Sequence, residues 1–188
     1  HSFPTRRSSD LFNSHKMSYK TVVFDTTEAT QSAFLSGRCD VYTTDMSDLA
    51  GIRTVAQDPS KYEILPTMIS KEPLGPAVRR GDDEFFQIVR WSFAAFLGAE
   101  ELGVTKANVD ELRKSSSNPD VQRLLGTGED MGRMLGLDKD WSYRIVKQVG
   151  NYGESWNEFF GPKSALNLPR GLNKLWTEGG LMYAMPIR

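Results

Sequence analysis

The first 70 residues alternate short β-branched runs with short stretches of helical character. The β-branched or aromatic runs lie at residues 19–25, 38–43 and 62–66. Thr27 and Gly37 bound the first helical stretch as a capping residue and a terminating glycine, and Pro59 ends the second. Strands that alternate with helices are typical of βαβ units around a parallel sheet. The pattern therefore predicts an α/β region here.

The pattern becomes helical after the Pro- and Gly-punctuated segment 71–76. Asp82 and Asp83 suit the positive amino end of a long helix. The residues expected on its buried face are Phe85, Ile88, Val89, Phe93 and Phe96. Large apolar residues recur again between Trp141 and Phe159, where Gly150 is expected to split or kink the helix.

Composition narrows the class of protein without naming a function. Of the 188 residues, 39% are hydrophobic and 25% charged, and the net charge is −1, which is ordinary for a globular protein. A nucleic-acid or anionic-membrane binder needs a basic excess, so neither kind of partner is expected. No apolar run approaches the roughly 20 residues that a transmembrane helix requires.

Few residues are available for metal binding or nucleophilic catalysis. The histidines are His1 and His15, and Cys39 is the single cysteine. A His-based catalytic or metal site within the folded region is therefore almost excluded, and so is a cysteine-rich zinc site. We expect no catalytic residue, no bound metal and no cofactor.

The run 38–43 ends on Thr43 and is followed by Thr44 and Asp45, an unusually polar ending for a strand. In an open parallel sheet, ligands bind where strands end and loops begin. A carboxylate there can pair with a ligand's ammonium group, and the hydroxyls can add contacts. The alternative is that Thr44, Asp45 or Ser47 caps the following helix, and the residues alone favour this alternative.

Residues 1–11 differ from the remainder of the chain. They show no helical or strand period and no secretory signal, and they resemble a translated sequencing adapter. We expect this segment to be non-native. The chain is then expected to be the tail end of a longer protein.

Several long phrases, in order along the chain, carry a resemblance to a known family: "GRCDVYTTD", "SKEPLGPAVRRGDDEFFQIVRW", "KQVGNYGE" and "LPRGLNKLWTEGGLMYAMPIR". The chain resembles the general L-amino-acid-binding proteins of bacterial ABC importers, in solute-binding protein family 3, over about residues 16–188. The resemblance implies an α/β type II periplasmic-binding fold of two lobes, here incomplete. Residues 16–70 would form part of lobe 2, 71–76 the inter-lobe crossing, and 77–188 the carboxyl-terminal part of lobe 1 with a helical extension.

The resemblance also implies a function. The chain would belong to a monomeric periplasmic protein that binds L-amino acids, delivers them to an ABC permease and is not an enzyme. Asp45 would pair with the ligand's α-ammonium, with Thr43 and Thr44 beside it. The family's Gly-Thr-Thr phrase and the preceding lobe-1 segment are not in this sequence, and the carboxylate-binding role is not transferred to Arg79 or Arg80. We therefore expect the α-carboxylate half of the site to be missing.

Other interpretations remain open from the sequence. One is a dehydratase-like enzyme on the same fold, in which Asp45, Glu28 or Glu72 would act as the acid or base. Another is the ligand-sensing domain of a receptor. For Cys39, a disulfide to a cysteine outside this chain and a small buried thiol are about equally favoured.

Overall fold

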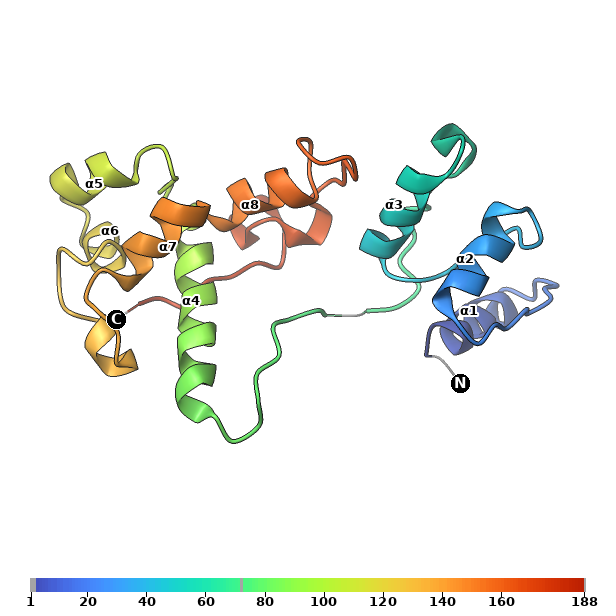
Figure 1. The fold of residues 1–188 in the computed structure, drawn as a ribbon, viewed down its shortest axis with the longest axis horizontal. Coiled ribbons are helices and arrows are strands. Elements are labelled where there is room, and N and C mark those ends of the chain that lie inside the picture. The colour runs from blue at the N-terminus through green and yellow to red at the C-terminus, as the bar shows by residue number, and fades with distance from the viewer. Residues whose placement is uncertain (1–2, 72, 188) are drawn as a thin grey trace. The chain divides into compact units, whose positions relative to one another are not determined.

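The computed structural model describes residues 3–71 and 73–187, which fall into two compact units (Figure 1). Unit 1 is His1–Leu74 and unit 2 is Gly75–Arg188. The division falls inside segment 71–76, whose role as a crossing between lobes stays a prediction. Glu72, one of the three alternative acids, lies outside the described residues.

Unit 1 is built from short helices. They are α1 (Phe3–Ser14), α2 (Thr27–Leu35), α3 (Met46–Val55) and the 3₁₀ turn η1 (Pro59–Lys61). Thr26, one residue earlier than predicted, caps α2 by accepting a hydrogen bond from the Ala29 amide at 3.2 Å. Gly37 follows the helix with φ of 76°, in the left-handed region where glycine is favoured, as predicted.

Helix α1 lies over most of segment 1–11, where the sequence shows no helical period. The helix is therefore a feature that the sequence pattern did not indicate. Nothing in the structure tests whether the segment is native, and that point stays a prediction.

The three runs predicted as strands form no β-ladder among the described residues of unit 1. A strand is stable only when a neighbour pairs with its backbone, and these runs do not pair with one another. Two of them instead meet α2 through aromatic rings. Phe34 lies 5.9 Å from the ring of Tyr42 and 5.3 Å from that of Tyr62. Side-chain packing, not a sheet, holds these connections.

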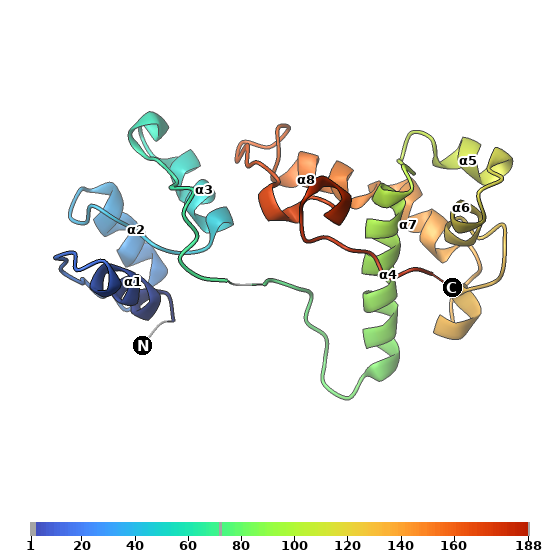
Figure 2. The ribbon, with the colours of Figure 1, turned by 180° about the vertical axis from the view of Figure 1, so that it is seen from behind.

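Unit 2 is a helical body around one long helix, α4 (Asp83–Glu101). The shorter helices are α5 (Val109–Ser115), α6 (Pro119–Leu124), α7 (Trp141–Val149) and α8 (Tyr152–Phe159), with 3₁₀ turns η2 (Gly132–Leu135), η3 (Gly171–Asn173) and η4 (Trp176–Glu178). Helix α4 packs against α6, α7 and α8, as both ribbon views show (Figures 1 and 2). An isolated parallel bridge joins Leu175 and Met182.

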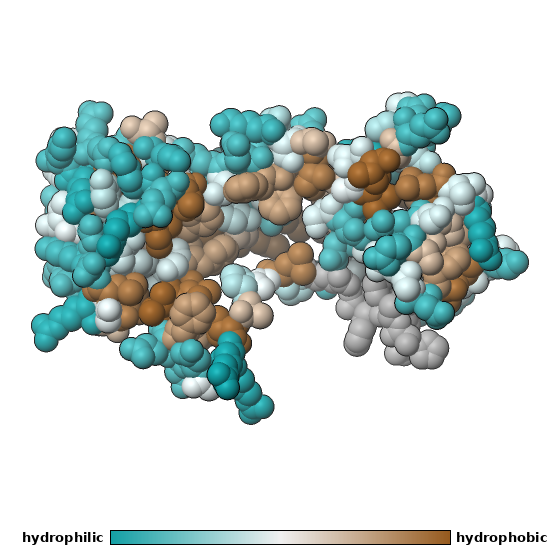
Figure 3. All heavy atoms as spheres, in the orientation of Figure 1, coloured by the Kyte–Doolittle hydropathy of each residue, from teal (hydrophilic) through white to brown (hydrophobic). Residues whose placement is uncertain are grey.

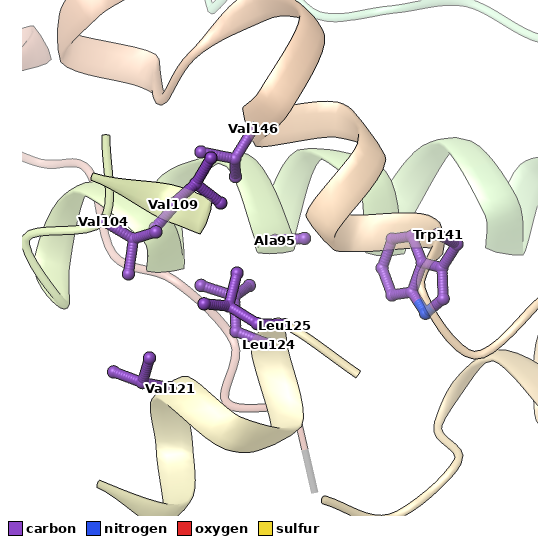
Figure 4. Packing of buried hydrophobic residues seen from close by; sticks show 9 residues of the cluster. Ala95, Val104, Val109, Val121, Leu124, Leu125, Trp141 and Val146 are labelled. Atoms are coloured by element: carbon purple, nitrogen blue, oxygen red, sulfur yellow. The ribbon is translucent and has the colours of Figure 1, made fainter. Parts of the chain in front are cut away.

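The core of unit 2 lies on the alanine-rich side of α4. Ala95 and Ala99 are fully buried there, because their small side chains let neighbouring helices approach closely. The residues around them are Val104, Val109, Val121, Leu124, Leu125, Trp141 and Val146 (Figure 4). The predicted helix is confirmed, but its predicted face is partly wrong, since Phe85 is 50% and Phe93 40% exposed.

The helix boundaries of unit 2 follow the capping residues in the sequence. Asp82 accepts a hydrogen bond from the Phe85 amide at 3.0 Å and so caps α4. Gly150, with φ of 80°, separates α7 from α8 as predicted.

A capping box then starts α8. The Asn151 side chain accepts from the Glu154 amide, and the Glu154 carboxylate accepts from the Asn151 amide, both at 2.9 Å. That carboxylate also accepts from the Lys106 amide at 3.0 Å, while Asn151 donates to the Val104 carbonyl at 2.9 Å. The bend between α7 and α8 is therefore fixed to the loop that follows α4.

Candidate functional site

The predicted ligand-binding residues lie immediately before and at the start of α3 in unit 1. Asp45 occupies the N-cap position, with φ of −60° and ψ of 147°, and its carbonyl accepts the Leu49 amide at 2.9 Å. Its side chain makes no capping hydrogen bond. Asp45 as a whole residue is partly buried, and its carboxylate has no hydrogen-bond or ion-pair partner in the part of the chain that the structure describes.

This geometry separates the two interpretations of Asp45 that the sequence left open. Asp45 is the N-cap of α3, as the capping interpretation expects, but it contributes to the helix only through its backbone carbonyl. A side-chain cap by Asp45 is not observed. The carboxylate therefore stands at the positive end of α3, where negative charge is stabilised, without being used by the helix.

Thr44 affects the titration of the neighbouring Tyr42. Burial raises the pKa of the Tyr42 phenol and the charge of Asp48 raises it further, whereas a hydrogen bond with Thr44 lowers it. The net direction is upward. Tyr42 therefore stays a neutral phenol at physiological pH, with its hydroxyl beside Thr44.

Thr43 makes a different contact from its neighbour. Its hydroxyl lies 2.8 Å from the hydroxyl of Ser8, on α1. Of the three predicted residues, Thr43 thus has a hydroxyl partner on α1, while the Asp45 side chain has no partner among the described residues.

Two further sequence candidates lie in unit 1, Glu28 and Cys39. Glu28 is exposed in the first turn of α2. Cys39 is half-buried with a free thiol, and both hypotheses about its pairing stay open. Within residues 3–71 and 73–187, no cluster of three potential metal ligands is found. Over those same residues, no helix is long and apolar enough to cross a membrane.

A polar cluster in unit 2 was not recognised from the sequence. The Tyr143 hydroxyl donates to Asp110 Oδ1 at 2.8 Å, and the Lys147 ammonium pairs with Asp110 Oδ2. The Arg113 guanidinium lies 4.0 Å from the centre of the Tyr143 ring. Tyr143 and Lys147 are four residues apart, a spacing that places both side chains on one face of a helix. That spacing could have indicated the cluster from the sequence. The hydrogen bond from Lys147 is the main reason that the pKa of Asp110 is lowered.

The sequence relatives of this chain are periplasmic amino-acid-binding proteins. No family model matches the sequence. The chain is 49% identical over 180 residues to the general L-amino acid-binding periplasmic protein of Rhizobium johnstonii, covering 95% of this chain and 53% of the relative. It is 47% identical over 179 residues to the glutamate/glutamine/aspartate/asparagine-binding protein of Rhodobacter capsulatus, with the same two coverages.

A solved structure agrees with the sequence relatives. The ABC transporter periplasmic binding protein from Brucella ovis, determined with glutathione bound, matches with a TM-score of 0.92 and 48% identity. The match covers 100% of this chain and 59% of that one. The resemblance to periplasmic amino-acid-binding proteins of ABC transporters is confirmed.

The fold class is confirmed by the same match, since the chain corresponds to part of a periplasmic binding protein. The chain spans about half the length of the curated relatives it matches. The comparisons do not test the roles of Asp45, Thr44 and Thr43, which stay predictions.

Proposed function

We propose that this chain forms part of the periplasmic substrate-binding component of an amino-acid ABC importer. The observation that carries the proposal is 49% identity over 180 residues to a protein named for general L-amino acid binding. The ligand is an L-amino acid, the partner is the permease of the importer, and the protein acts as a monomeric binder without catalysis. The dehydratase-like and receptor alternatives have no observation in their favour.

The ligands in the relatives' names share one piece of chemistry. Glutamate, glutamine, aspartate and asparagine all carry an α-ammonium and an α-carboxylate, and so does glutathione. A binder that accepts several of them gains most by holding these common groups and leaving room for the side chain.

Asp45 is the residue proposed to hold the α-ammonium. Three features support this role: Asp45 is a partly buried residue, its carboxylate has no partner among the described residues, and its side chain does not cap α3. A charge-assisted hydrogen bond from an ammonium group would satisfy it. Thr44 and Thr43 would add hydroxyl contacts, for which Thr43 must exchange its contact with Ser8.

The test is calorimetric titration of L-glutamate and L-glutamine. Residues 16–188 are joined to the part of the Rhizobium relative that this chain does not span. Asp45→Asn keeps the size of the side chain and removes its charge, and we expect it to weaken binding by about 2–5 kcal/mol.

Asp40→Asn is the matched control, because Asp40 is an exposed carboxylate in the same connection. It should leave affinity unchanged. Equal affinity of the Asp45→Asn and unmutated chimeras would remove Asp45 from the site. No binding of any amino acid by a folded, unmutated chimera would refute the proposed function itself.

A further inference from the structure

An open cavity of about 490 Å³ lies within unit 2, beside the polar cluster around Asp110. Its walls come from α5, from α7 and from the segment that follows α6, and its lining residues are Asp110, Arg113, Lys114, Thr127 and Tyr143. The volume falls within the range of about 300–1,000 Å³ that is typical of small-molecule sites. The surface around α5 is mostly hydrophilic in the view of Figure 3. The cavity therefore suits a polar solute.

Arg113 is held in place but keeps its hydrogen-bond donors unused. Its guanidinium lies 4.0 Å from the centre of the Tyr143 ring, a distance typical of a cation–π contact. Among the described residues, no hydrogen bond or ion pair occupies its N–H groups. A planar guanidinium that rests on a ring can offer its fork of N–H groups to two oxygens of an anion.

Lys114 brings a second positive charge to the same cavity. It is exposed, and its ammonium forms no hydrogen bond or ion pair with the described residues. Both Arg113 and Lys114 lie in the last turn of α5, where the helix dipole stabilises cations. The dipole explains why basic residues are found at this end of the helix, but it leaves their N–H groups available to a ligand.

The Asp110 carboxylate does not cancel these two charges. It is paired with the Lys147 ammonium and accepts a hydrogen bond from the Tyr143 hydroxyl at 2.8 Å. The pair of Asp110 and Lys147 is neutral as a whole, so the charges of Arg113 and Lys114 remain uncompensated. Thr127 adds a hydroxyl whose hydrogen bond to the Gln122 carbonyl is long, at 3.4 Å, and therefore weak.

We propose that this cavity binds a small solute through a doubly charged phosphate group. The N–H fork of Arg113 donates to two phosphate oxygens, Lys114 pairs with the remaining charge, and the Thr127 hydroxyl donates to the group as well. A phosphate monoester carries nearly two negative charges at neutral pH and three acceptor oxygens, which match these donors. The proposal goes beyond amino-acid binding and does not depend on it, because Asp45 takes no part.

The experiment titrates the full 188-residue chain, isotope-labelled for NMR, with inorganic phosphate and separately with glycerol phosphate. Sodium chloride keeps the ionic strength constant, because exposed charges are screened by salt. We expect saturable shifts of the Arg113 side-chain N–H and of the Thr127 amide at millimolar phosphate. Acetate, with its single charge, should bind more weakly than either phosphate.

Two variants separate the roles of the two cations. Arg113→Gln should weaken phosphate binding by about 10- to 100-fold, the usual loss for a charge-assisted hydrogen bond. Lys114→Gln should weaken it by about 2- to 5-fold, as expected for an exposed ion pair. Because Lys114 is exposed and unpaired, this second variant should fold like the unmutated chain even if Arg113→Gln does not.

Arg133→Gln is the matched control, since Arg133 is an exposed residue of unit 2 that does not line the cavity. Its phosphate affinity should equal that of the unmutated chain. Three results would overturn the proposal: no saturable shift at millimolar phosphate, equal weakening by Lys114→Gln and Arg133→Gln, or binding to phosphatidylglycerol vesicles without binding of the soluble phosphates. Failure of the chimera to bind amino acids would count against the proposed function and leave this phosphate site in place.

Discussion

Arg170 forms a bidentate ion pair with Glu100, and the pair joins residues 70 positions apart in the sequence. Its Nη2 lies 3.0 Å from Glu100 Oε2, and its Nη1 contacts Oε1. Each side chain is only 15% exposed. The guanidinium also donates to the Asn173 carbonyl at 2.8 Å and lies 5.3 Å from the ring of Tyr152. One side chain thus links α4, α8 and the carboxyl-terminal segment.

Replacing Glu100 by Gln should destabilise unit 2. The change leaves the Arg170 guanidinium largely buried without a counter-charge, which costs about 3 kcal/mol of unfolding free energy. Urea unfolding followed by tryptophan fluorescence measures the loss. Glu111→Gln, at an exposed carboxylate on α5, should cost less than about 0.5 kcal/mol. Equal stability of the two variants would show that the pair contributes nothing.

Replacing two helical glycines by Ala should change the stability of the chain in opposite directions. At Gly153, a Cβ would lie 2.5 Å from Glu100 Oε1 and 3.1 Å from Arg170 Nη1, so it would displace the ion pair. At Gly98, the closest atom is the Ala184 Cβ at 3.9 Å, an ordinary contact. We expect Gly98→Ala to stabilise the chain by about 0.5–1 kcal/mol through helix propensity.

Gly153→Ala gains the same propensity but should be net destabilising by about 1–2 kcal/mol, since overpacking outweighs it. Thermal unfolding by calorimetry compares the two. A stabilised Gly153→Ala variant would mean that the ion pair relaxes at no cost.

The Asp110 cluster should make stability depend on pH at the acid end. The hydrogen bond from Lys147, with that from Tyr143 second, holds the pKa of Asp110 below its usual value. A carboxyl with a lowered folded-state pKa stabilises the fold above its unfolded pKa of about 4, and this contribution disappears as pH falls through the folded value. Asp110→Asn should therefore flatten the fall in melting temperature below about pH 4.

Glu129→Gln, an exposed carboxylate without a side-chain partner among the described residues, serves as the control. Its melting temperature should keep the pH dependence of the unmutated chain. The hydrogen bond with Asp110 raises the pKa of Lys147, so this contribution is complete below the unfolded pKa of about 10.4 and is lost as pH rises through the raised folded value. An unchanged acid profile in Asp110→Asn would contradict the role assigned to the cluster.

Local chemistry explains which parts of the fold the sequence predicts well. Asp82, Gly37 and Gly150 act within a few residues of themselves, so their roles at helix ends follow from sequence alone. The burial of a side chain does not follow from sequence alone, because it depends on which other elements pack against it. Helix α4 buries its alanines and leaves Phe85 half-exposed, since close packing against α6 and α7 favours the small side chains.

The same holds for the candidate site, where local features could be predicted from the sequence and contacts between distant residues could not. The polar ending at Asp45 is visible in the sequence, and so is the start of α3 at that position. The sequence does not reveal that the Asp45 carboxylate lacks a cap partner, or that Thr43 contacts Ser8 from a distant helix. Strand prediction fails at residues 38–43 because β-structure depends on a pairing partner, and the three predicted runs do not pair with one another.

The bend between α7 and α8 has a consequence for exchange with solvent. The amides of Asn151 and Lys106 lie outside any helical hydrogen-bond ladder, yet both donate to the Glu154 carboxylate. Deuterium should therefore enter these positions more slowly than it enters ordinary loop amides, and at similar rates for both, because one opening event releases them together. The Lys106 and Asn151 amides, on two separate segments of the chain, would then share a single protection factor.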